Sequence, residues 1–139
     1  LGDVYKRQAP NLVHVHGWIS SLIPLYINHY YKDDPIFNNT KTIVSIYDNR
    51  LKGNLDKNFL KKIEFDDIVD KNLQLLKKPT YEELYKLSIS QADGVIFTSG
   101  SSKDKFKDFV RKDASIMECT SNEDYEKKYL QFYNSFFDE

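Results

Sequence analysis

Hydrophobic positions along the chain alternate between two patterns, short continuous runs and runs with three- and four-residue spacing. Continuous runs rich in β-branched residues occupy Leu12–His16, Thr42–Tyr47 and Val95–Thr98, and a weaker one occupies Ala114–Glu118. Runs of this length that end at Gly, Asp or Ser are typical of buried strands. We therefore expect three strands and a short fourth.

The segments between these runs have helical spacing. Trp18 to Tyr31 carries apolar residues three and four apart, which predicts an amphipathic helix that Pro24 kinks or weakens. Two short helices are expected between Asp56 and Lys78. Thr80 and Glu83 form a T-x-x-E capping box, so another helix starts there.

Two more helices complete the pattern. One opens at Ser99-Gly100-Ser101-Ser102, and the last runs from Asn122 to Phe137. The last helix carries an aromatic stripe, which we expect to face the core; a platform for a ligand is the alternative. The stripe consists of Tyr125, Tyr129, Phe132 and Phe136.

Strands that alternate with helices predict right-handed β-α-β units. The expected fold is α/β, a Rossmann-like three-layer α/β/α unit with a parallel sheet covered on both faces. Residues 1–8 (LGDVYKRQ) precede this pattern, and we interpret them as a non-native adapter scar. A real edge strand over Asp3–Lys6 is the alternative. The expected domain is a partial unit that spans residues 9–139.

Composition excludes several classes of protein. The 139 residues have a formal net charge of −1, so the basic surface typical of a nucleic-acid binder is missing. No apolar run approaches the roughly 18 residues that cross a membrane. Cys119 is the one cysteine and is expected to be a buried small side chain. With no secretory signal, a reducing cytoplasm is the expected compartment.

Two weak chemical signals have simpler interpretations. His14 and His16 share a face of the first strand, but a metal site needs a third ligand and His29 lies on the following helix. We therefore expect no metal, with one histidine packed in the sheet and the other at its edge. The Ser99–Ser102 loop could hold an anion, yet an ordinary N-cap is the favoured interpretation. No cofactor motif is present, and none is expected.

The carboxyl ends of the strands are the best-placed candidate site. Ligands of parallel sheets bind outside these ends. Trp18 and Tyr47 could stack on a sugar there, while His16 and Asp48 could hydrogen-bond its hydroxyl groups. These four residues are the candidate substrate-binding residues, and no catalytic residue is assigned.

Three sequence blocks resemble the N-terminal catalytic domain of bacterial glycogen/starch synthases. They are N-L-V-H-V-H-G-W-x-x-x-L-x-P-L-Y, Y-K-D-D-P-I-F-x-N-T-K-T-x-x-S-I and D-K-N-F-L-K-K. The likeness covers roughly Pro10 to Ser102. It implies half of the first domain of a two-Rossmann-domain glycosyltransferase. The family reaction is glucose transfer from ADP-glucose to an α-1,4-glucan, so α-glucan and ADP-glucose are the implied partners.

The chain departs from the family pattern where sugar contacts are implied. The family's Asp before the Trp falls on Gly17, its His after the Trp on Ile19, and its second-strand His on Tyr47. A pocket that loses such hydrogen-bonding partners loses affinity and selectivity. The glycine loop and the donor-binding domain of the family also have no counterpart here. We therefore expect a glycosyltransferase-related fragment that is inactive as this chain. A non-catalytic relative that binds glucan or a protein partner is the alternative.

The resemblance also predicts an uncovered strand edge. The first strands of a doubly wound sheet lie at its centre, so an upstream segment is expected to pair with Leu12–His16. Without it the β-branched edge would invite association with other chains. We expect Pro10 to Glu139 alone to be aggregated or molten, and the upstream half to restore a cooperative transition. An unrelated Rossmann-like domain is a third possibility if the upstream sequence lacks the glycine loop.

Overall fold

A parallel four-stranded sheet forms the centre of the molecule. The computed structural model describes residues 9–48, 53–63, 71–119 and 124–137. The strands lie in the order β1-β2-β3-β4, and every neighbouring pair is parallel. They span Leu12–His16 (β1), Lys41–Ile46 (β2), Gly94–Phe97 (β3) and Ser115–Glu118 (β4). The predicted α/β class with a parallel sheet is therefore confirmed.

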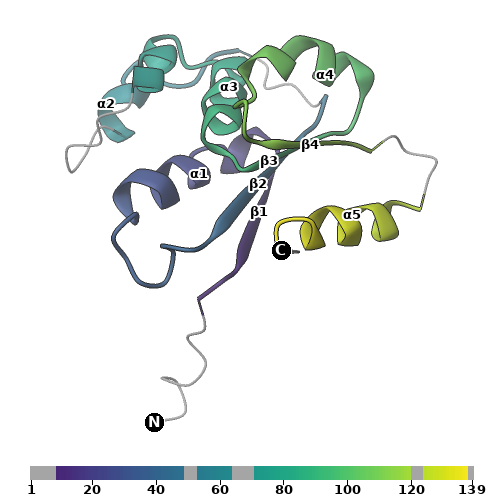
Figure 1. Ribbon diagram of the computed structural model, residues 1–139. Helices are drawn as coiled ribbons and strands as arrows, with labels where there is room; N and C mark the ends of the chain where they lie inside the picture. Colours follow the sequence, from purple (N-terminus) through teal and green to yellow (C-terminus); the bar gives the residue numbers. More distant parts are fainter. Residues whose placement is uncertain (1–8, 49–52, 64–70, 120–123, 138–139) are drawn as a thin grey trace.

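Helical segments connect consecutive strands (Figure 1). The β1–β2 connection holds η2 (Trp18–Ser20), α1 (Ile23–Leu25) and η3 (Tyr26–Tyr30). The β2–β3 connection holds α2 (Phe59–Ile63), η4 (Lys71–Lys77) and α3 (Tyr81–Gln91). The β3–β4 connection holds α4 (Gly100–Phe106) and η5 (Lys107–Phe109), and α5 (Tyr125–Asn134) follows β4.

The order of the strands decides which face each helix covers. Each crossover from one strand to the next moves across the sheet in the same direction. Right-handed crossovers that all move in one direction place their helices on one face. In Figure 1, α1 to α4 lie together on one side of the sheet and α5 lies on the other. The sheet is thus the middle of three layers, and the second face receives one helix from the described residues.

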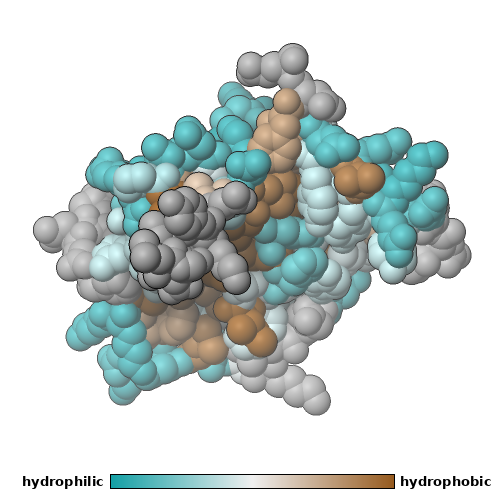
Figure 2. All heavy atoms as spheres, turned by 90° about the horizontal axis from the view of Figure 1, so that it is seen from below, coloured by the Kyte–Doolittle hydropathy of each residue, from teal (hydrophilic) through white to brown (hydrophobic). Residues whose placement is uncertain are grey.

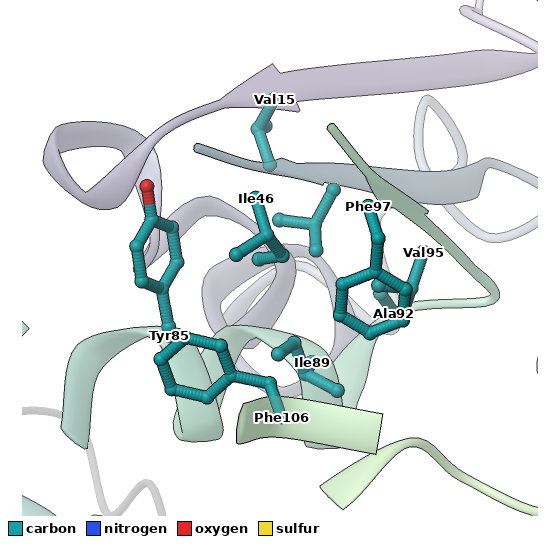
Figure 3. Close-up of a cluster of buried hydrophobic side chains, with 9 residues drawn as sticks. Val15, Ile46, Tyr85, Ile89, Ala92, Val95, Phe97 and Phe106 are labelled. Carbon is teal, nitrogen blue, oxygen red and sulfur yellow. The ribbon is translucent and has the colours of Figure 1, made fainter. Parts of the chain in front are cut away.

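The main core lies between the sheet and α3 (Figure 3). Alternate strand residues point toward this helix and are buried, among them Val15, Ile46 and Phe97. Tyr85 and Ile89 of α3 pack against them. Because α3 also packs against a second buried cluster around Leu25 and Leu76, apolar side chains are buried on more than one of its sides.

The expected helix from Trp18 to Tyr31 is broken into three short pieces, which corrects the prediction of one continuous helix. A 3-10 turn comes first, then the α1 turn, then a π-helical turn that ends at Tyr30. Pro24 stands in the first turn of α1, where its missing N–H costs little. The hydrophobic spacing therefore predicted which side of this segment is buried, while Pro24 determined where regular α-helix could begin.

Other boundaries differ by one to three residues. β2 ends at Ile46 and β3 at Phe97, because these two residues form the last register pair and Tyr47 and Thr98 lie beyond it. α5 begins at Tyr125, while the expected start at Asn122 lies outside the described residues. The α3 cap is confirmed by the Thr80 hydroxyl, which accepts a hydrogen bond from the Glu83 N–H at 3.2 Å.

The second face of the sheet is closed by aromatic residues of α5. A Cβ added to Gly94 would lie 2.7 Å from the Phe136 ring, 3.1 Å from the Ile43 side chain and 3.2 Å from the Phe132 ring, so a larger residue would require these neighbours to move. Yet no described residue of α5 is fully buried: Tyr129, Phe132 and Phe136 of the stripe are half-buried and Tyr125 is exposed, so the stripe faces the core only in part. Viewed from below, hydrophobic residues form a central band with hydrophilic residues on either side (Figure 2).

β1 has a neighbour on one side only among the described residues. The Lys41 N–H donates to the Asn11 carbonyl and the Gly17 N–H to the Ser45 carbonyl. In a parallel strand, every second residue forms its backbone hydrogen bonds with the same neighbouring strand. Asn11 and Gly17 bond to the β2 side, so the backbone groups of Leu12 and His14 point to the open edge. That edge is where an additional strand could pair. The expected aggregation of residues 10–139 alone stays a prediction, and where the chain alone does not fold, the measurements below are made with its upstream segment attached. Separately, the described helices include none with the length and apolar character needed to span a bilayer.

Enlarging Gly94 tests how closely α5 packs. We expect Gly94→Val to lower the free energy of unfolding by about 1–3 kcal/mol, because its side chain would collide with Phe132 and Phe136. Chemical denaturation measures this. Gly100→Ala is the control, since no atom lies within 4 Å of its added Cβ. Equal stability of Gly94→Val and wild type would show that α5 does not lie against β3.

Candidate functional site

His14 is the centre of a polar cluster on the second face of the sheet. Its Nδ1 lies 2.7 Å from the Tyr133 hydroxyl of α5, and its Nε2 lies 2.8 Å from the Ser45 hydroxyl of β2. The Ser45 hydroxyl also bonds the phenol of Tyr129. Both ring nitrogens of His14 are thus used within the protein. This histidine links the sheet to α5, as expected of a packed residue and not of a metal ligand.

His16 and Tyr47 form a pair at the carboxyl ends of β1 and β2. The Nδ1 atom of His16 lies 2.8 Å from the Tyr47 hydroxyl. The His16 ring also stacks on His14, with centroids 4.0 Å apart. His16 is exposed and Tyr47 half-buried, so the pair is accessible to solvent from the strand ends. Two of the four candidate residues are therefore in direct contact.

Asp48 lies beside α4. Its carboxylate oxygens accept from the Ser101 hydroxyl, each at 3.1 Å. Tyr47, Asp48, Ser101 and Lys105 line a small polar pocket of about 50 Å³. The Ser99 hydroxyl caps α4 by accepting from the Ser102 N–H at 3.1 Å. The N-cap interpretation of this serine loop is therefore confirmed.

Trp18 points in another direction from the other three candidate residues. It packs against both buried clusters on the α3 face of the sheet. With Ile19, Leu22 and Phe59 it also lines an apolar pocket of about 330 Å³. Ile19 is 82% exposed at this pocket. The ring of Trp18 therefore has a structural role and does not face His16 and Tyr47 across one cleft.

The remaining titratable candidates lie away from this region. His29 contacts the Gln91 side chain at 3.0 Å, near the other end of the sheet. Cys119 is half-buried and not fully buried as expected, because it follows the last residue of edge strand β4. Among the described residues, no three His, Cys, Asp or Glu side chains converge to form a metal site.

Sequence reasoning missed the residues that complete the cluster. Ser45 stands opposite His16 in the β1–β2 register and two residues before Tyr47, so strand alternation places it on the same face. The two-residue spacing from Tyr47 could therefore have identified Ser45 from the sequence. Tyr129 and Tyr133 come from a helix more than a hundred residues later in the chain, and local spacing could not assign their partner.

Burial and the neighbouring imidazole change the acidity of His14. Loss of solvent and repulsion by His16 lower the pKa of His14 from 6.5 to about 4. His14 is therefore neutral near pH 7, with one ring nitrogen donating and the other accepting. Burial likewise raises the pKa of Tyr129 and of Tyr133 above the ordinary value of 10, so both phenols stay protonated.

The parallel sheet and the polar groups at its carboxyl ends define a Rossmann-like α/β unit of the kind that binds ligands at those ends. The family model for the starch synthase catalytic domain matches residues 2–110. The chain belongs to the starch synthase catalytic domain family. Residues 111–139, which include β4 and α5, lie outside the match.

Individual relatives match a shorter part of the chain. The glycogen synthase of Thermotoga maritima is 37% identical over 60 residues, which are 43% of this chain and 12% of that protein. The glycogen synthase of Vibrio vulnificus is 41% identical over 44 residues, 32% of this chain and 9% of that protein. No solved structure matches significantly. The aligned segment is thus about an eighth or less of each relative's length.

The lowered pKa of His14 predicts a specific dependence of stability on pH. The unfolded chain binds this proton near pH 6.5 and the folded chain only near pH 4, so acid favours the unfolded state over that interval. We expect the free energy of unfolding to fall by about 1–3 kcal/mol from pH 7 to 4 through this residue, at about 1.4 kcal/mol per pKa unit reduced for partial exposure.

Other groups also titrate in this range, so the measurement is a comparison of variants. His14→Gln should remove this part of the pH dependence, while His29→Gln should keep it. Urea denaturation at several pH values measures the difference. Identical pH profiles for His14→Gln and wild type would contradict the assignment.

Proposed function

We propose that this chain is a glucan-binding part of a glycogen synthase-related protein and does not transfer glucose from ADP-glucose by itself. The observation that carries the proposal is the His16–Tyr47 pair at the carboxyl ends of β1 and β2. An imidazole, a phenol and the nearby Asp48 carboxylate offer donors, acceptors and ring faces to a neutral polyol. Such groups bind sugars without requiring charge on the ligand.

Substitutions at the implied sugar contacts support binding without catalysis. At Tyr47, where the resemblance implies a histidine, the hydroxyl is held by His16. At Gly17, where it implies an aspartate, the backbone has a φ of +70°, a conformation that favours glycine. Ile19 replaces a histidine and lies exposed at an apolar pocket. The local backbone and packing therefore suit Gly17, Ile19 and Tyr47, and not the sugar-contacting residues that the resemblance implies.

The local charges also favour binding over group transfer. Transfer from a nucleotide sugar needs positive charge where the diphosphate leaves. Lys105 of α4 lines the pocket with Tyr47 and Asp48, and both it and Lys103 of the same helix are paired with a carboxylate, Glu82 and Glu118 respectively. Neutralised lysines give a departing diphosphate weaker stabilisation than free ones would.

The open edge of β1 fits a chain that functions within a larger protein. The aligned part is about an eighth of the length of a curated relative, and among the described residues no strand pairs with the outer edge of β1. We propose that an upstream segment of the parent protein adds a strand there. The ends of β1 and of that strand would then lie side by side, next to His16.

A protein-binding role is the second candidate function. It is favoured by Ile19, which is 82% exposed beside the apolar pocket of Trp18, Leu22 and Phe59. Exposed apolar groups around a pocket are typical of contacts with other proteins. Glucan binding that is insensitive to Ile19→Ser, together with partner binding that is lost, would separate the two roles.

Calorimetry with maltotriose and an assay of ADP release test the proposed function together. We expect the chain to bind maltotriose and to release no ADP from ADP-glucose above a heat-inactivated control. His16→Ala should weaken binding about 10-fold, because it removes a ring face and a hydrogen-bonding group worth about 1.4 kcal/mol. His29→Ala, far from the site, should bind like wild type. Absence of maltotriose binding, or turnover of ADP-glucose, would contradict the proposal.

A further inference from the structure

We propose that three tyrosines of α5 extend the candidate sugar site into an elongated glucan-binding track. This inference rests on the proposed function, and it concerns a part of the chain outside the family match. Tyr125, Tyr129 and Tyr133 recur every four residues, so they lie along one side of the helix. We call these three residues the tyrosine row.

The tyrosine row is continuous with the site at the strand ends. Within the row, ring centroids lie 6.5 Å and 5.9 Å apart. The Tyr133 ring lies 5.7 Å from His14, which stacks on His16 at 4.0 Å. The His16 ring in turn lies 6.1 Å from Tyr47. An unbroken series of rings thus runs from the start of α5 to the carboxyl end of β2.

Structural packing explains only the inner part of this series. Tyr133 attaches α5 to His14, and Phe132 and Phe136 close on Gly94. Tyr125 is 60% exposed and meets only the ring of Tyr129 among the ring contacts of the described residues, so it does not serve to attach the helix. Packing within the described residues therefore leaves the Tyr125 ring accessible to a ligand at the outer end of the series.

The chemistry of the series suits a chain of neutral sugars. Tyr125 offers an exposed apolar ring and a hydroxyl, while the hydroxyls of half-buried Tyr129 and Tyr133 are bonded to Ser45 and His14, so these two contribute the accessible parts of their rings. Such rings match the apolar faces of glucose units in a glucan. Burial raises the pKa of the Tyr129 and Tyr133 phenols, so these two side chains stay uncharged. A short oligosaccharide would occupy the His16–Tyr47 end, and a longer one would reach Tyr125.

The experiment compares a short and a long ligand on the full 139-residue chain. Calorimetry should show maltoheptaose binding about 10-fold more tightly than maltotriose. Tyr125→Ala should reduce that preference to about twofold or less while leaving maltotriose affinity unchanged. Leu130→Ala is the matched control, because Leu130 is also 60% exposed on α5 but lies outside the row. Circular dichroism checks that each variant is folded.

The outcomes separate this inference from the proposed function. If wild type binds neither oligosaccharide, the proposed function and the track are both wrong. If it binds maltotriose but shows no preference for maltoheptaose, or if Tyr125→Ala keeps the preference, only the track is wrong.

Discussion

The strands lie across the sheet in the same order as in the sequence, and the rest of the structure depends on this constraint. Because each strand follows its neighbour in sequence, right-handed connections put α1 to α4 on a single face. That face receives an apolar core around Tyr85 and Ile89. The other face must be covered by something that is not a crossover helix. In this chain α5 returns beneath the sheet and covers it.

This arrangement explains why the polar chemistry lies where it does. His14 and His16 alternate with Val15 on β1, and they face the side that α5 alone covers among the described residues. A fully apolar layer would have left the partly buried His14 imidazole without partners, at a cost of about 2 kcal/mol or more. Instead Tyr133 and Ser45 bond His14, while His16 remains accessible next to Tyr47. The candidate site is thus the solvent-facing end of the contact that holds α5.

Strand positions and the parallel class of the sheet were predictable from the sequence, and long-range pairing was not. The run Leu12–His16, the cap at Thr80 and a parallel sheet all followed from local patterns. The spacing of Trp18 and His16 could not predict that their side chains would lie in different places. Gly17 stands between them with a positive φ, which redirects the chain. Nor could spacing show that α5 would meet β1, since that contact depends on the space left at Gly94.

The position of α5 against the second face is the central claim, and proton–proton contacts measured by NMR test it most directly. The account predicts nuclear Overhauser effects between the α protons of Gly94 and the ring protons of Phe136, whose ring an added Cβ at Gly94 would reach at 2.7 Å. A second set should join the ring protons of His14 and Tyr133. A well-dispersed spectrum that shows the β2–β3 contacts but lacks both of these sets would contradict the account.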